Sequence, residues 1–307
     1  MTYALEIFEI DPQGYDLLKK VEAENASLSK IWSIKKEWDN EWDQWKQIAF
    51  KELKEEEEIL AAMDERAVEI KMKLDNLDSQ ERKWKVTEYI NDKIRVFRDT
   101  IPLIEDLRHE SMRDRHWKEL RIEVKEDFDE DDESFNVEKI FDLQLINHIE
   151  KISDLCANAQ KQLTIENSLK NIKKMWEEDP QTELVIERIK ENKNEELYKI
   201  TTTENIIQLI EDHSQQLAQH KSSPYYKQFD DQIDYWEQNI NKINETLDLL
   251  INVQNDWMYL EGIFKGQPDL AKQLPQENAT FLSVDQVFIK EMNRIREIKK
   301  AYPALVD

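Results

Sequence analysis

Residues 229–260 read FDDQIDYWEQNINKINETLDLLINVQNDWMYL, and apolar side chains recur along this stretch at intervals of three and four residues. This is the period of one face of an α-helix, so the stretch predicts a long amphipathic helix. The apolar positions that make the pattern are Phe229, Ile233, Trp236, Ile240, Ile243, Leu247, Leu250, Val253, Trp257 and Leu260. Similar spacing elsewhere predicts a mainly α fold, an elongated helical bundle or rod.

Glycine and proline, the residues that most often interrupt helices, are scarce in this chain. It has 307 residues with 3 glycines and 7 prolines, and residues 15–101 contain neither. One unbroken helix over that stretch would be about 130 Å long, so we expect a break, at the polar segment 75–79. Before it, a stripe rich in tryptophan predicts core packing rather than an aromatic platform for a ligand: Ile31, Ile34, Trp38, Trp42 and Trp45.

Further along, the sequence predicts boundaries of several kinds. Pro102 predicts a helix break and a boundary between residues 1–100 and 101–307. Asn136 is expected to cap a helix, because Phe135 and Ile140 have the spacing of a hydrophobic staple. The period then changes from helical to β-prone, which predicts one small β-hairpin at about residues 183–200, around a turn at 191–194. The next helix is expected to begin with Thr201 in a capping box, and the last to cover residues 280–301.

The balance of charges restricts the kind of partner. The chain carries 67 acidic and 43 basic side chains, a formal net charge of −24, and no basic patch interrupts it. Such a charge repels nucleic-acid backbones and anionic membrane surfaces, so we expect neither as a partner and expect proteins instead. Cys156 is the single cysteine and cannot form an internal disulfide, which favours a reducing intracellular compartment.

Tests for known chemical sites give no candidate catalytic, cofactor-binding or metal-binding residue. Gly262 and Gly266 have the wrong spacing for a phosphate-binding loop and no Lys-Ser/Thr pair follows them. The acidic loop has carboxylates at EF-hand positions, but Asp132 stands where that loop needs glycine. The histidine pairs 109/116 and 213/220 are seven residues apart, about 10 Å along a helix, too far to share one zinc ion easily.

Several separated sequence segments resemble one family, the N-terminal linker region of dynein heavy chains. The order and spacing of these segments also resemble those of the family. The segments are IPLIEDLR (101–108), RHW (115–117), IENSL (165–169) with Trp176, LIEDH (209–213), KSS (221–223), VQNDWMYLEGIF (253–264) and QLP (273–275). The resemblance begins at about Ile101 and covers about two-thirds of the chain. Residues 1–100 resemble, less specifically, the helical neck or tail end that precedes the linker.

The resemblance implies a mechanical element of a microtubule motor. In this family the linker transmits ATP-driven changes of a ring of AAA+ modules to the tail, and ATP and Mg²⁺ bind in that ring, outside this fragment. The implied partners are the ring itself and other dynein heavy, intermediate or light chains, with microtubules contacted only through absent regions. The implied location is the cytoskeleton, with the ciliary axoneme favoured over cytoplasmic dynein.

Three questions stay open from the sequence. The chain could be a free-standing acidic helical scaffold without a motor, although no internal repeat of fixed period supports a spacer. Within the linker interpretation, the aromatic residues Trp257, Tyr259 and Phe264 are candidates for a mechanical docking surface. The other interpretation of these three side chains is that they close the core of their own helices. The apolar stripes of residues 1–100 would serve pairing within the chain or with another heavy chain equally well.

Overall fold

The computed structural model describes residues 16–192 and 195–306. The chain divides into two compact units, Met1–Gln160 and Lys161–Asp307, each with its own hydrophobic core. The division falls inside helix α8 (Ile149–Glu178). The mainly α fold with one small hairpin is confirmed for the described residues.

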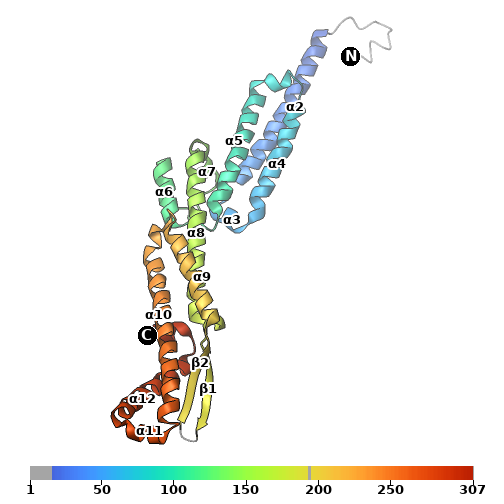
Figure 1. The fold of residues 1–307 in the computed structure, drawn as a ribbon. Helices are drawn as coiled ribbons and strands as arrows, with labels where there is room; N and C mark the ends of the chain where they lie inside the picture. Colours follow the sequence, from blue (N-terminus) through green and yellow to red (C-terminus); the bar gives the residue numbers. More distant parts are fainter. Residues whose placement is uncertain (1–15, 193–194, 307) are drawn as a thin grey trace. The chain divides into compact units, whose positions relative to one another are not determined.

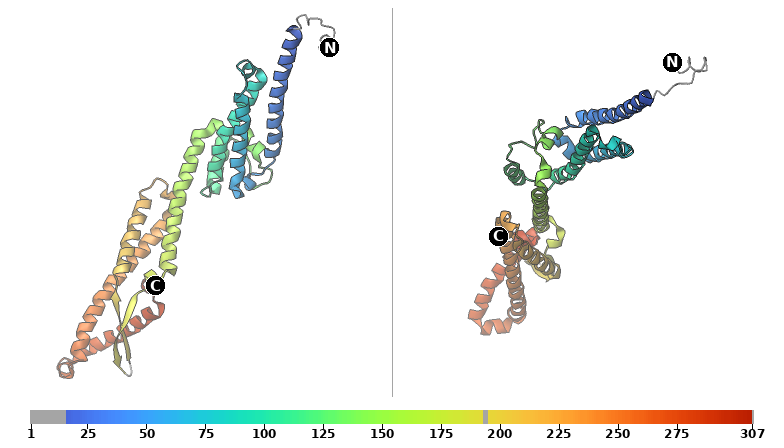
Figure 2. Two further views of the ribbon diagram at one scale, coloured as in Figure 1. Left: turned by 90° about the vertical axis from the view of Figure 1, so that its right-hand side faces the viewer. Right: turned by 90° about the horizontal axis from the view of Figure 1, so that it is seen from above.

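The first unit is built from helices (Figure 1). They are α2 (Asp16–Trp45), α3 (Phe50–Glu55), α4 (Glu57–Asp75), the 3₁₀ turn η1 (Glu81–Lys83), α5 (Lys85–Arg108), α6 (Asp114–Val124), α7 (Val137–Asp142), η2 (Leu145–His148) and the first part of α8. Helices α2, α4 and α5 lie side by side in Figures 1 and 2. The expected break at 75–79 is confirmed, because α4 ends at Asp75 and α5 begins at Lys85.

The tryptophan stripe of α2 packs into the core of this unit, as predicted. Trp38 and Trp45 are buried, and Phe97 of α5 contacts both rings. The ring centroids of Trp38 and Phe97 lie 5.5 Å apart edge to face, and those of Trp45 and Phe97 lie 5.0 Å apart in a stack. These aromatic contacts fix the register between α2 and α5.

The second unit combines helices with the hairpin (Figure 2). Its elements are the rest of α8, η3 (Pro180–Thr182), β1 (Val185–Asn192), β2 (Glu195–Thr202), α9 (Glu204–Lys221), η4 (Tyr226–Gln228), α10 (Asp230–Phe264), α11 (Pro268–Gln273), α12 (Pro275–Ile298) and α13 (Ala301–Leu305). The strands pair antiparallel, with Ile186 opposite Ile200 and Asn192 opposite Glu195. Residues 193 and 194 of the predicted turn lie outside the described residues.

Helix capping follows the sequence at one predicted site and departs from it at another. Asn136 is the N-cap of α7, and its side-chain oxygen accepts a hydrogen bond from the backbone N–H of Lys139 at 3.0 Å. The prediction for Thr201 is wrong, because this residue belongs to β2 and α9 begins only at Glu204. Pairing with β1 extends the strand through Thr202, past the expected cap.

The helix break expected at Pro102 is also wrong. Helix α5 continues through it to Arg108, so the predicted boundary after residue 100 lies inside a helix. Proline removes one backbone donor, but Ile101, Leu103 and Ile104 are buried on both sides of it and hold the helix in place. The last long helix, expected at 280–301, starts earlier at Pro275 and ends at Ile298, because Lys299 has a positive φ of 63°.

The core of the second unit contains a buried polar pair. The Trp176 indole N–H of α8 donates to Nδ1 of His213 on α9 at 3.1 Å. Trp176 is fully buried and His213 is 8% exposed. Burial lowers the pKa of His213 below its ordinary value of 6.5, against the opposing effect of Asp212. The neutral ring accepting the indole proton is therefore the form that the fold stabilises.

A second buried polar side chain joins α10 to the hairpin. Gln254 is 4% exposed, its Oε1 accepts from the backbone N–H of Ile200 at 2.7 Å, and its Nε2 donates to the carbonyl of Ile200 at 2.9 Å. The amide thus pairs with β2 as a neighbouring strand would. The sequence pattern had placed Val253 on the buried face, but Val253 is 46% exposed and Gln254 takes that position.

We expect the stability of the second unit to fall as the pH is lowered from 7.5 to 5.5, because unfolded His213 gains a proton near pH 6.5 whereas folded His213, whose pKa is lowered by burial, gains it at lower pH. His213→Asn keeps an acceptor near the Trp176 indole but cannot titrate. The variant should therefore lose less stability than the wild type over this range, by up to about 1 kcal/mol. Denaturant unfolding at the two pH values measures this difference. Equal losses in both chains would contradict the prediction.

Replacing Gln254 should loosen the hairpin. Gln254→Leu removes both hydrogen bonds and leaves the buried N–H and C=O of Ile200 unpaired, so we expect a loss of about 2–4 kcal/mol in unfolding free energy. Hydrogen exchange at the Ile200 amide should accelerate. The matched control Val253→Leu alters the exposed neighbour and should leave that amide protected. An unchanged Ile200 exchange rate in Gln254→Leu would show that the pairing contributes nothing.

Candidate functional site

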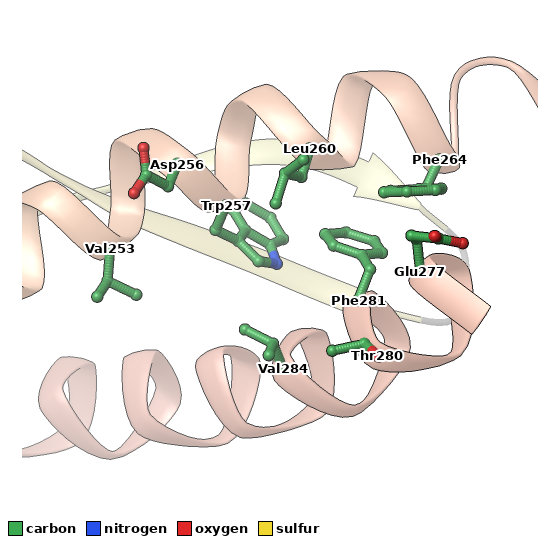
Figure 3. A pocket seen from close by; sticks show the side chains of 9 residues that line it. All are labelled: Val253, Asp256, Trp257, Leu260, Phe264, Glu277, Thr280, Phe281 and Val284. Atoms are coloured by element: carbon green, nitrogen blue, oxygen red, sulfur yellow. The ribbon is translucent and has the colours of Figure 1, made fainter. Parts of the chain in front are cut away.

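An apolar groove lies between the C-terminal half of α10 and the facing side of α12, both in the second unit (Figure 3). Its volume is about 540 Å³. Figure 3 shows side chains from both helices directed into the space between them. The lining residues are Val253, Asp256, Trp257, Leu260 and Phe264 from α10, and Glu277, Thr280, Phe281 and Val284 from α12.

The connection between the two helices lies between Phe264 and Glu277, the last lining residue of α10 and the first of α12. Gly266 follows α10, and a Cβ atom at this position would lie 2.2 Å from the carbonyl oxygen of Gly262, so the chain can leave the helix this tightly only with glycine here. Pro268 and Pro275 then occupy the first positions of α11 and α12. Proline suits this position because its fixed φ matches a helix and no N–H is needed there.

An indole and an ion pair between the exposed Lys265 and the buried Asp285 hold the base of the groove. The Trp257 ring stacks on Phe288 with centroids 4.4 Å apart, and its indole N–H donates to Oδ1 of Asp285 at 3.0 Å. Lys265 Nζ donates to the same oxygen at 2.9 Å and lies 2.7 Å from Oδ2. Asp285 is 5% exposed, and Lys265 and the indole N–H supply the hydrogen bonds that a buried carboxylate needs. This network fixes the end of α10 against α12.

The walls of the groove are open and apolar. Phe264 and Phe281 stack with centroids 5.3 Å apart, and Val253 and Val284 remain about half exposed. The only charged residues of the lining are the carboxylates Asp256 and Glu277. The groove can therefore receive an apolar side chain, and its rim favours a neighbouring cation over an anion.

The structure separates the three residues that the sequence grouped as a docking surface. Trp257 and Phe264 line the groove together, although Trp257 is itself 3% exposed and part of the core. Tyr259 is 70% exposed and does not line the groove. Sequence reasoning missed Asp285, although a signal was present. It occupies an apolar position in the series Phe281, Asp285, Phe288, Met292 and Ile295, where a carboxylate needs a buried partner.

The cysteine and histidine residues discussed next are buried or hydrogen-bonded within the fold. Burial raises the pKa of the Cys156 thiol to about 12, so it stays protonated near neutral pH. His116 Nδ1 accepts from the backbone N–H of Arg113, and His220 lies 2.8 Å from the Ser168 hydroxyl. Among residues 16–192 and 195–306, no group of three or more His, Cys, Asp or Glu side chains is placed to hold a metal ion. No helix of this described part is long and apolar enough to cross a membrane.

Breaking the ion pair at the base of the groove should destabilise the second unit. Lys265→Met keeps the length of the side chain but leaves the Asp285 carboxylate buried without its cation, so we expect a loss of roughly 2–4 kcal/mol in unfolding free energy. The double variant Lys265→Met/Asp285→Asn should recover part of that loss, because no charge is then buried. Denaturant unfolding of both variants measures it. If the double variant were no more stable than Lys265→Met, the loss could not come from the unpaired carboxylate of Asp285.

Comparisons with known proteins identify the family. The family described as "Dynein heavy chain, N-terminal region 2" matches residues 18–306. "Dynein axonemal heavy chain 2" of Mus musculus is 35% identical over 99% of this chain, which covers 7% of that relative. "Dynein-1-beta heavy chain, flagellar inner arm I1 complex" of Chlamydomonas reinhardtii is 35% identical over 95% of this chain. "Dynein heavy chain, cytoplasmic" of Drosophila melanogaster is 26% identical over 91% of this chain. In both cases the aligned part is 6% of the length of the relative. The chain belongs to the dynein heavy chain family and carries its N-terminal region 2.

Proposed function

We propose that this chain is the mechanical neck and linker segment of a microtubule motor. In this proposal residues 101–307 correspond to the proximal linker and residues 1–100 to the end of the neck or tail, and helix α5 runs continuously from one part into the other. The segment transmits ATP-driven changes of an AAA+ ring to the tail, and ATP and Mg²⁺ bind in that ring. The observation that carries the proposal is the continuous family match over residues 18–306. The chain spans about 7% of the length of the first two relatives, so the motor activity belongs to a much longer protein.

The physical properties of the second unit support a role in transmitting force. Its long helix α10 is tied to the hairpin through Gln254 and to α12 through Trp257 and Lys265. Gln254, Trp257 and Asp285 are buried and make hydrogen bonds of defined geometry, so the elements resist sliding past one another. A segment that transmits force needs this stiffness. The acidic surface also fits a segment that does not itself grip the acidic microtubule.

The proposed location is the ciliary axoneme. The relatives named as axonemal or flagellar reach 35% identity, against 26% for the cytoplasmic heavy chain of Drosophila melanogaster. The proposed partners are the ring of the same chain and other dynein heavy, intermediate or light chains. A ciliary motor would slide neighbouring microtubule doublets.

The coding sequence downstream of Asp307 distinguishes this proposal from a free-standing acidic helical scaffold. The motor proposal requires AAA+ modules in frame, each recognisable where functional by a Gly-x-x-x-x-Gly-Lys-Ser/Thr loop. A reading frame that continues without any such module would overturn it and leave the scaffold as the function to test.

Softening α10 should uncouple ATP hydrolysis from movement. In the full heavy chain, glycine at the exposed positions Glu245, Asp248 and Asn252 weakens the helix by about 1 kcal/mol per site without changing its buried face. We expect microtubule gliding at saturating ATP to slow at least twofold, while the ATPase rate of the purified motor stays near that of the wild type.

The matched control carries alanine at the same three positions. It removes the same polar groups but keeps the helix stiff, so gliding should match the wild type. Equal gliding speeds for the glycine and alanine variants would contradict a force-transmitting role for α10. A parallel fall of gliding and ATPase in the glycine variant would do so as well, because it would indicate a general loss of the motor.

A further inference from the structure

Helix α2 has two apolar faces, and the first unit covers one of them. The inward face consists of Ile31, Ile34, Trp38 and Trp45, which are buried in the core. No residue of α2 before Ile31 is buried. In Figures 1 and 2 the N-terminal end of α2 projects beyond the ends of α4 and α5, where these helices cannot cover it.

The second face of α2 is an exposed stripe with the spacing of a coiled coil. Its members, Leu18, Val21, Asn25, Leu28 and Trp32, follow one another at intervals of three, four, three and four residues. All five are exposed: Leu18 at 52%, Val21 at 53%, Leu28 at 40% and Trp32 at 54%, with Asn25 likewise at the surface. Alternating three- and four-residue steps form the a and d positions of heptads. At 100° per residue this stripe lies about 130° around the helix from the inward face.

The single polar member of the stripe is informative. Asn25 occupies an a position between apolar residues. A lone asparagine at such a position lowers affinity but selects the register of the partner helix, because it needs a polar side chain opposite. Exposed residues that bind no partner helix have no register to select. The pattern therefore indicates a specific helix as the occupant.

Charge argues against a second copy of this chain as that helix. The positions flanking the stripe carry Glu22 and Glu24, and the whole chain has a net charge of −24. Two copies would bring these carboxylates close together, which is unfavourable. A helix whose flanking positions carry lysine or arginine would instead pair with them.

The length of the stripe decides between a tethered and a free partner. Residues 18–32 span about two heptads, and two separate chains lose translational and rotational freedom on pairing that so short an interface does not repay. A helix of the same polypeptide that can reach the stripe binds in an intramolecular step, at an effective concentration of up to about millimolar, and avoids most of that loss. Relatives that align with 99% of this chain extend far beyond it, since the aligned part is 7% of their length.

We propose that the stripe Leu18, Val21, Asn25, Leu28 and Trp32 is the docking face for an amphipathic helix of the same heavy chain, located outside residues 1–307. That helix has apolar a and d positions, a polar side chain facing Asn25 and basic flanks. The proposal rests on family membership and does not depend on a mechanical role for the linker.

Site-specific photo-crosslinking in the full heavy chain tests the proposal. A benzophenone side chain at position 25 or 28 should crosslink to a heavy-chain peptide outside residues 1–307, identified by mass spectrometry. The control places the same group at Ala23, which is exposed and lies on the opposite side of α2. A crosslink to another polypeptide, to a second copy or to a site within residues 1–307 would overturn the proposal. So would crosslinking at 25 and 28 no stronger than at Ala23.

Hydrogen exchange provides a second measurement that does not need a crosslink. Amides of residues 20–29 should exchange at least tenfold more slowly in the full heavy chain than in the 1–307 segment. Leu28→Asp in the full chain should abolish that protection, and Ala23→Asp should preserve it. Equal protection in the segment and the full chain, or in the two variants, would overturn the proposal.

Discussion

The second unit depends on polar side chains buried along one face of α10. Gln254 takes the place of a strand beside β2, and three residues later Trp257 donates to the carboxylate of Asp285. Apolar contacts would hold α10 against its neighbours in many registers, whereas these hydrogen bonds are satisfied in one. Because one helix carries both connections, the hairpin and α12 have fixed positions relative to each other. The groove exists because the chain is held at its base by the Asp285 network.

In the first unit, contacts between aromatic rings fix the positions of the helices. Phe97 contacts both Trp38 and Trp45, so α2 and α5 are fixed by shape instead of by hydrogen bonds. This packing uses only one side of α2. The other side leaves its heptad stripe exposed, and this is the face on which we propose that a helix from elsewhere in the heavy chain docks.

The histidine and cysteine side chains with shifted pKa values lie in structural surroundings. The described histidines with shifted pKa values are buried acceptors or neighbours of hydroxyl groups, and the thiol of Cys156 is held protonated by burial. What these residues contribute is packing and orientation. The proposed function assigns the chemistry of ATP to the ring of the full heavy chain, and it assigns the transmission of force to α10 and the contacts that hold it.

The sequence by itself determined the helical fold, the position of the hairpin, the cap at Asn136 and the family, because these depend on local periodicity and short motifs. It did not determine the course of α5 through Pro102, since a local rule about proline was outweighed by the burial of Ile101, Leu103 and Ile104. Only the tertiary structure showed that Gln254, and not Val253, faces the core, and that Asp285 is the partner of Trp257. Such pairs join residues far apart in the chain, and the energy that buries a polar group comes from a partner that the local sequence does not contain.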